Sequence, residues 1–245
     1  ALVSPVVAGL AAFCAVKLIF AVVKHMSDKQ VESGFRHGQT VTACLVALSH
    51  GTNDAQKTMG IITLTLIAVG LQPSGSGPEL WVVAICGLAI AAGTYMGGWR
   101  VIRTLGKGLT EISTPQGFAA EAASATTILV SSHLGFALST TQVCSGSIIG
   151  TGLGKKGNPV NWGVAGRMAI AWLVTFPAAG IVGALACALA KTGVWGTVAT
   201  VAIAVCVALI IFRLSKRNPV NSGNVNDSHI NAEKTRTVQP QAQAA

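Results

Sequence analysis

The chain has 245 residues, of which 51% are hydrophobic and only 10% are charged, and its mean hydropathy is +0.60. Soluble domains carry about a quarter charged residues, so the composition excludes an ordinary soluble domain and predicts an integral membrane protein. The formal net charge of +9 lies mostly in short loops and the tail, and aromatic residues make up only 5%, which argues against nucleic acid as a partner. The six cysteines form no CxxC pair, so neither a disulfide framework nor a zinc site is expected.

A helix crosses the bilayer core in roughly 20 residues. Apolar runs that suit such spans lie at residues 2–23, 40–70, 80–99, 164–190 and 193–212. Residues 214–245 are rich in Asn, Gln, Ser and Ala and have too little apolar surface to fold. We therefore expect a membrane domain over residues 1–213 and a disordered tail. The chain starts without an initiator Met, and we expect it to be part of a longer polypeptide.

Basic residues mark the loops on the cytoplasmic side of a membrane protein. They follow the first span, follow the 80–99 span and open the tail, as Lys24, Lys29, Arg36, Arg100, Arg103, Lys107, Arg213, Lys216 and Arg217. The loop 71–79 has no Lys or Arg and is expected outside. Residues 118–152 must then begin and end in the cytoplasm, yet these roughly 35 residues are too few for two crossings. We predict a re-entrant helical hairpin, in a multi-pass protein of the cell membrane whose tail is cytoplasmic.

The run 40–70 is interrupted by a polar segment, His50-Gly-Thr-Asn-Asp-Ala-Gln-Lys57. A glycine followed by Asn53, with Gln56 three residues later, is a helix-start signature. We predict that the helix breaks at residues 51–53 and restarts at Asp54. A carboxylate at the bilayer centre costs roughly 2.5–3.5 kcal/mol on insertion scales, so Asp54 is expected to bind a substrate or coupling ion. Lys57, one turn later, either only neutralises Asp54 or takes part in function.

The hairpin segment contains a second polar group, Ser139, Thr140, Thr141 and Gln142. It matches the S-x-x-Q capping box, which predicts a helix that starts near mid-membrane. Exposed N–H groups and the positive end of the helix dipole make such a terminus an anion site. Secondary transporters also build substrate sites from discontinuous helices at the midplane. The small residues that follow are interpreted as helix-packing positions, namely Ser145, Ser147 and Gly150.

The sequence leaves the roles of three further polar residues undecided. Glu121, early in the hairpin, is either an interfacial charge or part of a buried pair with Arg167. A lone histidine such as His50 or His133 is often only hydrogen-bonded inside a bundle. The spacing His50-x-x-x-Asp54 suits a shared ligand only if the helix is intact, which the predicted break at Gly51 argues against.

Together the two polar segments resemble the inorganic phosphate transporter (PiT) family, over about residues 1–213. The family signature Gly-Ala-Asn-Asp-Val-Ala-Asn-Ala is matched by Gly51-Thr-Asn-Asp-Ala-Gln-Lys-Thr58. The later family motif, Pro-Val-Ser-Thr-Thr-His followed by Gly-Ser and Gly-x-Gly, is matched by Ala137-Leu-Ser-Thr-Thr-Gln142, Gly146-Ser147 and Gly150-Thr-Gly152. The resemblance implies an all-α integral membrane bundle with two inverted halves, each holding a broken helix and a re-entrant hairpin. This chain would be the C-terminal half, and its site would need the N-terminal half or a second copy of the chain.

The resemblance implies a phosphate symporter that is not an enzyme and needs no cofactor or bound metal. The phosphate-binding residues would be Asn53, Asp54, Ser139, Thr140 and Thr141. Coupling residues or charge partners would be Asp54, Lys57, Gln142 and Glu121. Two positions depart from the family pattern, because Lys57 replaces an Asn and Gln142 replaces a His. The lysine form resembles the bacterial low-affinity branch, which implies proton coupling rather than sodium coupling. It also implies uptake of phosphate either as the free anion or as a neutral metal complex.

The site chemistry also distinguishes among oxyanions. Near neutral pH phosphate keeps at least one P–OH donor, which a carboxylate such as Asp54 can accept, whereas sulfate has no proton to offer. The alternatives are a transporter of another oxyanion such as sulfate, a sodium-coupled phosphate symporter, and a membrane enzyme with a metal on His50, Asp54 and His133. A scaffold subunit would leave the intramembrane Asp54 unexplained.

Overall fold

The computed structural model describes residues 3–95, 97–136, 138–155, 157, 159–216, 220 and 223–225. Within these residues the chain is built of helices and contains no strand, as the composition predicts. Its helices are α1 Ser4–Val22, η1 Val23–His25, α2 Asp28–Ala68, α3 Leu80–Tyr95, α4 Trp99–Arg103, η2 Thr104–Gly108, α5 Thr114–His133, α6 Thr140–Gly154, α7 Trp162–Ala190 and α8 Val194–Ser215. The chain divides into two compact units, one with α1 to α6 and the other with α7 and α8.

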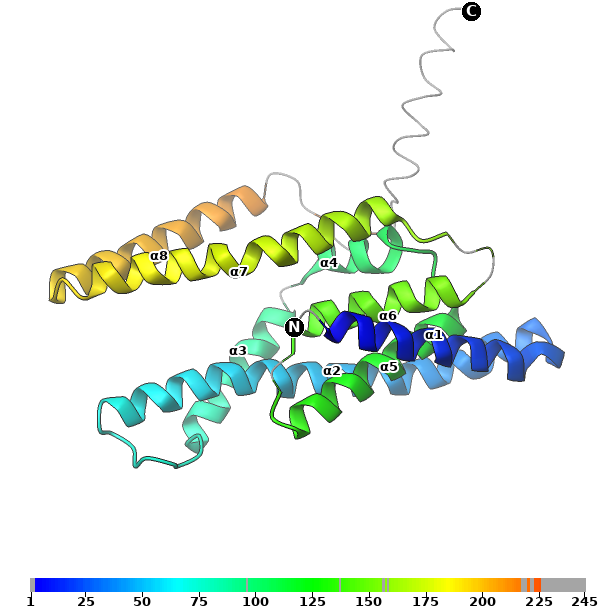
Figure 1. Ribbon diagram of the computed structural model, residues 1–245, viewed down its shortest axis with the longest axis horizontal. Helices are drawn as coiled ribbons and strands as arrows, with labels where there is room; N and C mark the ends of the chain where they lie inside the picture. The colour runs from blue at the N-terminus through cyan, green and yellow to red at the C-terminus, as the bar shows by residue number, and fades with distance from the viewer. Residues whose placement is uncertain are drawn as a thin grey trace, which may run out of the picture. The chain divides into compact units, whose positions relative to one another are not determined.

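In the first unit, α1 packs along α6, and α5 contacts α1, α2 and α6. Figure 1 shows α1 and α6 side by side, with α5 and the long α2 next to them. The α1–α6 contact depends on glycine. A Cβ atom on Gly146 would lie 2.1 Å from the Pro5 carbonyl oxygen, and one on Gly150 would lie 2.0 Å from that of Gly9. Only residues without a side chain allow this approach, so the packing interpretation of Gly150 is confirmed.

Helices α5 and α6 form the predicted helical hairpin. Gln116 Nε2, in the first turn of α5, donates to the Thr151 carbonyl in the last turn of α6 at 3.3 Å. The hairpin therefore begins and ends at the same end of the unit, as the charge pattern predicts. Helix α5 is capped by Ser113, whose capping box with Gln116 is complete.

The predicted break in the 40–70 helix is wrong, because α2 runs without interruption through 41 residues. Gly51 and Asn53 lie inside it, and its N-cap is Ser27. Thr52 Oγ1 donates to the Leu48 carbonyl at 2.9 Å, within the helix. At 1.5 Å per residue α2 is about 60 Å long, twice the thickness of the hydrocarbon core. Part of α2 must therefore extend beyond the bilayer, and its N-terminal turns carry the charges that suit water.

The expected spans 2–23, 164–190 and 193–212 are confirmed, since helices long and apolar enough to cross a membrane occur at Ser4–His25, Trp162–Ala190 and Val194–Leu214. The span expected at 80–99 is shorter than predicted. Helix α3 ends at Tyr95, and Gly97 and Gly98 follow with φ angles of +132° and +121°. Those angles suit glycine alone, and Trp99 begins the separate helix α4.

The second unit is a pair of helices, α7 and α8, that pack against each other. Gly193, with φ of +112°, caps α8 at the turn between them. Most of the apolar side chains of both helices are exposed within the unit, which suits surfaces that meet lipid. The tail expected to be disordered, residues 214–245, lies outside the described residues except for 214–216, 220 and 223–225.

Candidate functional site

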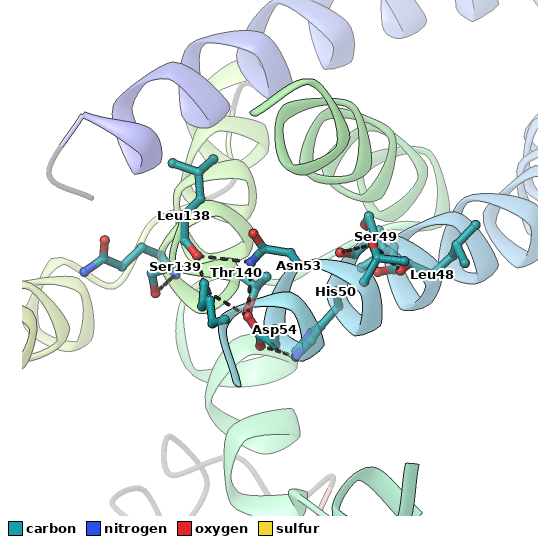
Figure 2. A network of polar contacts seen from close by, with 12 residues as sticks. Leu48, Ser49, His50, Asn53, Asp54, Leu138, Ser139 and Thr140 are labelled. Carbon is teal, nitrogen blue, oxygen red and sulfur yellow. Dashed lines mark hydrogen bonds and ion pairs between the residues drawn. The ribbon is translucent and has the colours of Figure 1, made fainter. Parts of the chain in front are cut away.

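The polar segment of α2 faces the turn of the α5–α6 hairpin (Figure 2). Asn53 is buried, and its Nδ2 donates to the carbonyl of Leu138 at 3.1 Å. Lys57 Nζ donates to the same carbonyl. Leu138 precedes Ser139, the N-cap of α6, so its carbonyl lies outside the hydrogen-bond ladder of that helix and can accept from α2. Two α2 side chains therefore hold the start of α6 in place.

Asp54 is the centre of this cluster. Its Oδ1 accepts from Asn53 Nδ2 at 3.1 Å and from Lys57 Nζ at 3.0 Å. Its Oδ2 accepts from Thr140 Oγ1 at 3.3 Å and lies 3.0 Å from His50 Nε2. The carboxylate therefore joins two turns of α2 to the first residue of α6. The pairing of Asp54 with Lys57, one of the two interpretations left open by the sequence, is present.

The N-terminus of α6 points its first turn at Asp54. Ser139 Oγ accepts from the backbone N–H of Gln142 at 3.4 Å, which confirms Ser139 as the N-cap. The N–H groups of Thr140 and Thr141 belong to the first turn, where no intrahelical acceptor exists. Thr140 is buried and Thr141 is exposed. The helix dipole adds a partial positive charge here, next to an Asp54–Lys57 pair whose formal charges cancel.

Gln142 does not complete the predicted capping box. Its side chain is only 5% exposed, and its Oε1 has no hydrogen-bond partner among the described residues. The capping boxes of α2 and α5 are complete, because Gln30 and Gln116 each accept a hydrogen bond from the N-cap serine of their helix. Among the described residues the Gln142 side-chain oxygen therefore makes no hydrogen bond to the Asp54 cluster.

Glu121 also lies apart from Asp54. It is half-buried, and its Oε2 accepts from Thr42 Oγ1 of α2 at 2.6 Å. It lines a groove of about 790 Å³ formed by α2, α3 and α5, whose wall also includes His50 and Tyr95. Of the expected site residues, the structure brings together Asn53, Asp54, Lys57 and Thr140, and it leaves Glu121 in the neighbouring groove.

A smaller cavity of about 180 Å³ lies beside Asn53. It is lined by Asn53, Gln56, Lys57, Ser132, Gly135 and Phe136. Ser132 Oγ donates to Asn53 Oδ1 at 3.4 Å. Sequence reasoning missed Ser132 and the Leu138 carbonyl, and no local pattern marks either one. His50 had a signal, the i to i+4 spacing with Asp54, which the expected helix break set aside.

No group of three or more His, Cys, Asp or Glu side chains that could hold a metal gathers in the part of the chain that the structure describes. The polar groups at the site are instead hydroxyls, an amide, an ammonium, a carboxylate and helix N–H groups. The hydroxyls, the amide, the ammonium and the helix N–H groups are donors that suit the oxygens of an oxyanion, and the carboxylate can accept from an oxyanion that carries a proton.

Comparison with known proteins identifies a family and several relatives that this chain resembles. Residues 1–183 match the phosphate transporter family. A probable low-affinity inorganic phosphate transporter of Mycobacterium tuberculosis is 50% identical over 229 residues, which cover 92% of this chain and 55% of that protein. A probable low-affinity inorganic phosphate transporter of Bacillus subtilis is 37% identical, covering 76% of this chain and 56% of that protein. This chain therefore spans about half the length of the curated relatives it matches.

A solved structure described as the sodium-dependent phosphate transporter has a TM-score of 0.60 with this chain. It is 24% identical, and the match covers 72% of this chain and 61% of the solved one. At that identity the likeness concerns the fold. The sequence match over residues 1–183, which contains both polar segments, carries the assignment, and the chain belongs to the phosphate transporter family.

Proposed function

We propose that the protein containing this chain imports inorganic phosphate across the cell membrane by proton symport. Relatives that are 50% and 37% identical are described as probable low-affinity inorganic phosphate transporters. The single observation that supports a phosphate site most strongly is the convergence of Asp54, Lys57 and Thr140 at the N-terminus of α6. It offers an ammonium, a hydroxyl and helix N–H groups to phosphate oxygens, and a carboxylate to the P–OH group.

In this proposal Asn53, Asp54, Ser139, Thr140 and Thr141 form this chain's side of the phosphate site. The Asp54–Lys57 pair would open to admit phosphate, since Lys57 can turn from the carboxylate to a phosphate oxygen. Both partners are partly exposed, with side-chain exposures of 38% for Lys57 and 31% for Asp54. The rest of the ligand shell would come from the N-terminal half of the protein or from a second copy of this chain.

Lys57 supports proton rather than sodium coupling. Its ammonium is 3.0 Å from Asp54 Oδ1, so before phosphate binds, a positive charge of the protein itself occupies the place next to the carboxylate where a sodium ion would bind. Sodium coupling is the second candidate, because the solved structure of similar fold is described as sodium-dependent. Gln142 and Glu121, the other expected coupling residues, lie outside the Asp54 cluster, which favours supporting roles for both.

The test is labelled-phosphate uptake by the full-length protein in liposomes, under an inward proton gradient, an inward sodium gradient or neither. We expect accumulation with the proton gradient, competition by arsenate and no competition by excess sulfate. Accumulation driven by sodium alone would overturn the proton proposal, and competition by sulfate would favour a general oxyanion transporter. Uptake that stops when divalent cations are chelated would indicate a metal-phosphate complex as the transported species.

A further inference from the structure

His50 connects the candidate phosphate site to the open groove. Its Nε2 lies 3.0 Å from Asp54 Oδ2, and its side chain is 48% exposed. It also lines the groove of about 790 Å³ between α2, α3 and α5. This position depends on the unbroken α2, because only an intact helix places residues i and i+4 side by side. One imidazole therefore contacts both the Asp54 carboxylate and a space from which a proton can arrive.

Asp54 is poorly placed to take a proton itself. Each of its oxygens already has two close nitrogen or hydroxyl neighbours, Asn53 and Lys57 on Oδ1 and Thr140 and His50 on Oδ2. A proton on either oxygen would displace one of these donors. If Asp54, which the sequence predicts to bind a substrate or coupling ion, took the coupling proton, one of these contacts would have to open first.

His50 can take a proton without losing a contact. An ionised carboxylate only accepts hydrogen bonds, so His50 Nε2 must carry a hydrogen toward Asp54, which leaves Nδ1 as the basic atom. Asp54 is the polar partner of His50 in the described part of the chain, so Nδ1 is open to a proton from water in the groove. Imidazole is the side chain that changes charge between pH 5 and 8.

A proton on His50 changes the charge of the site. Asp54 and Lys57 cancel each other, so the cluster has no net formal charge when His50 is neutral and a charge of +1 when His50 is protonated. A phosphate anion at the N-terminus of α6 is bound better by the positively charged cluster. Because coupling between two sites is reciprocal, bound phosphate also favours the protonated imidazole.

Other titratable or charged groups lie near His50 on α2, α3 and α5. On α5, Glu121 faces the groove, and its carboxylate would stabilise a positive imidazole while accepting from Thr42. On α3, Tyr95 lines the groove. On α2 itself, Lys57 bonds the other oxygen of Asp54, and its positive charge opposes a positive imidazole until the ammonium turns to a phosphate oxygen. From α6 the nearest contact to the pair is the hydroxyl of Thr140, which does not titrate in this range.

We propose that His50 carries the coupling proton, taking it at Nδ1 from the groove and releasing it to water after the site reopens. The inference rests on the proposed function. It predicts that protonation of His50 tightens phosphate binding by roughly 5- to 150-fold, the usual range for coupled sites. His50→Gln is the informative variant, since its amide can still donate to Asp54 but cannot take the proton.

The experiment compares two activities of the full-length protein in liposomes. One is exchange of labelled for unlabelled phosphate at equal pH on both sides, which needs no net proton movement. The other is accumulation driven by an inward proton gradient. For His50→Gln we expect phosphate exchange to persist at the rate that the wild type shows at pH 7.5, and we expect gradient-driven accumulation to be lost. The tighter binding that the wild type gains toward pH 5.5 should be absent, so that only the titration of phosphate itself remains in the pH dependence of exchange. The matched control is His37→Gln, since His37 is exposed on the same helix and, among the described residues, its ring bonds the Ser33 carbonyl alone, at 2.8 Å.

The outcomes separate the two proposals. If the wild-type protein exchanges no phosphate, the proposed function fails. If the wild type exchanges phosphate and His50→Gln still accumulates it under the proton gradient, His50 does not carry the proton. If His50→Gln loses exchange as well, His50 is needed for binding or folding and the inference is overturned. Loss of gradient-driven accumulation in Glu121→Gln, with His50→Gln unaffected, would assign the proton to Glu121.

Discussion

Thr140 Oγ1 donates a hydrogen bond to Asp54 Oδ2 across 3.3 Å, although 86 positions separate the two residues in the sequence. The contact fixes the first residue of α6 to the middle of α2. Each residue belongs to one of the two motifs from which the family resemblance was drawn. In the folded chain the two motifs therefore contribute to one cluster of polar side chains.

Removing the Thr140 hydroxyl should weaken phosphate binding. A hydrogen bond to a charged group contributes about 1.5–3 kcal/mol, so Thr140→Ala should raise the phosphate concentration for half-maximal uptake at least about tenfold. Thr140→Ser keeps the hydroxyl and should stay near the wild type. Thr65→Ala is the matched control, because Thr65 is exposed on α2 and bonds only within its helix, to the Ile61 carbonyl. Equal uptake by Thr140→Ala and the control would remove Thr140 from the site.

Lys57 should determine the response to sodium. If its ammonium takes the place of a bound cation, Lys57→Asn should lose most phosphate uptake in sodium-free buffer, because Asp54 is left without its 3.0 Å partner. Added sodium should then restore part of that uptake, while potassium should not. Measurement of labelled-phosphate uptake across a sodium series checks this. A variant that sodium leaves inactive, or that is fully active without sodium, would show that Lys57 does not stand in for a cation.

A side chain added at the α1–α6 contact should lower the stability of the protein more than one added at an open glycine position. Gly150→Ala would place its Cβ 2.0 Å from the Gly9 carbonyl oxygen, so the helices must separate. We expect a loss of about 1–3 kcal/mol, the usual cost of overpacking, seen as a lower apparent Tm of the purified protein in detergent. Gly34→Ala is the control, since a Cβ there meets nothing within 4 Å. An unchanged Tm for Gly150→Ala would contradict the packing described for these two helices.

The sequence predicted the membrane helices best, because a long apolar run is enough to specify such a helix. Long apolar runs predicted α1, α7 and α8, and the charge pattern together with the length of residues 118–152 predicted the α5–α6 hairpin. Ser139 was identified as an N-cap because capping uses neighbours within three residues. Roles assigned to individual site residues remain predictions.

The predicted break in α2 is wrong because the cap signal of Gly51 and Asn53 is weaker than the preference of a membrane helix for an unbroken backbone. Glycine costs a helix about 1 kcal/mol, whereas a broken helix in hydrocarbon leaves backbone groups unsatisfied at several kcal/mol each. Continuing the helix through Gly51 is therefore cheaper. Asn53, read as a cap, instead donates to Leu138 in the hairpin, a partner that no sequence window contains. The same error hid His50, whose contact with Asp54 requires the intact helix.

The most direct test of the central claim is labelled-phosphate exchange by the full-length protein carrying Asp54→Asn, beside Asp28→Asn, which removes the same charge from the exposed first turn of α2. The amide removes the charged acceptor for the P–OH group of phosphate and leaves Lys57 without an anionic partner. We predict that Asp54→Asn reduces exchange at least about tenfold, as expected when a charged hydrogen bond of about 1.5–3 kcal/mol is lost, while Asp28→Asn remains at the wild-type rate. Exchange at the wild-type rate by a correctly inserted Asp54→Asn protein would contradict a phosphate site at this position.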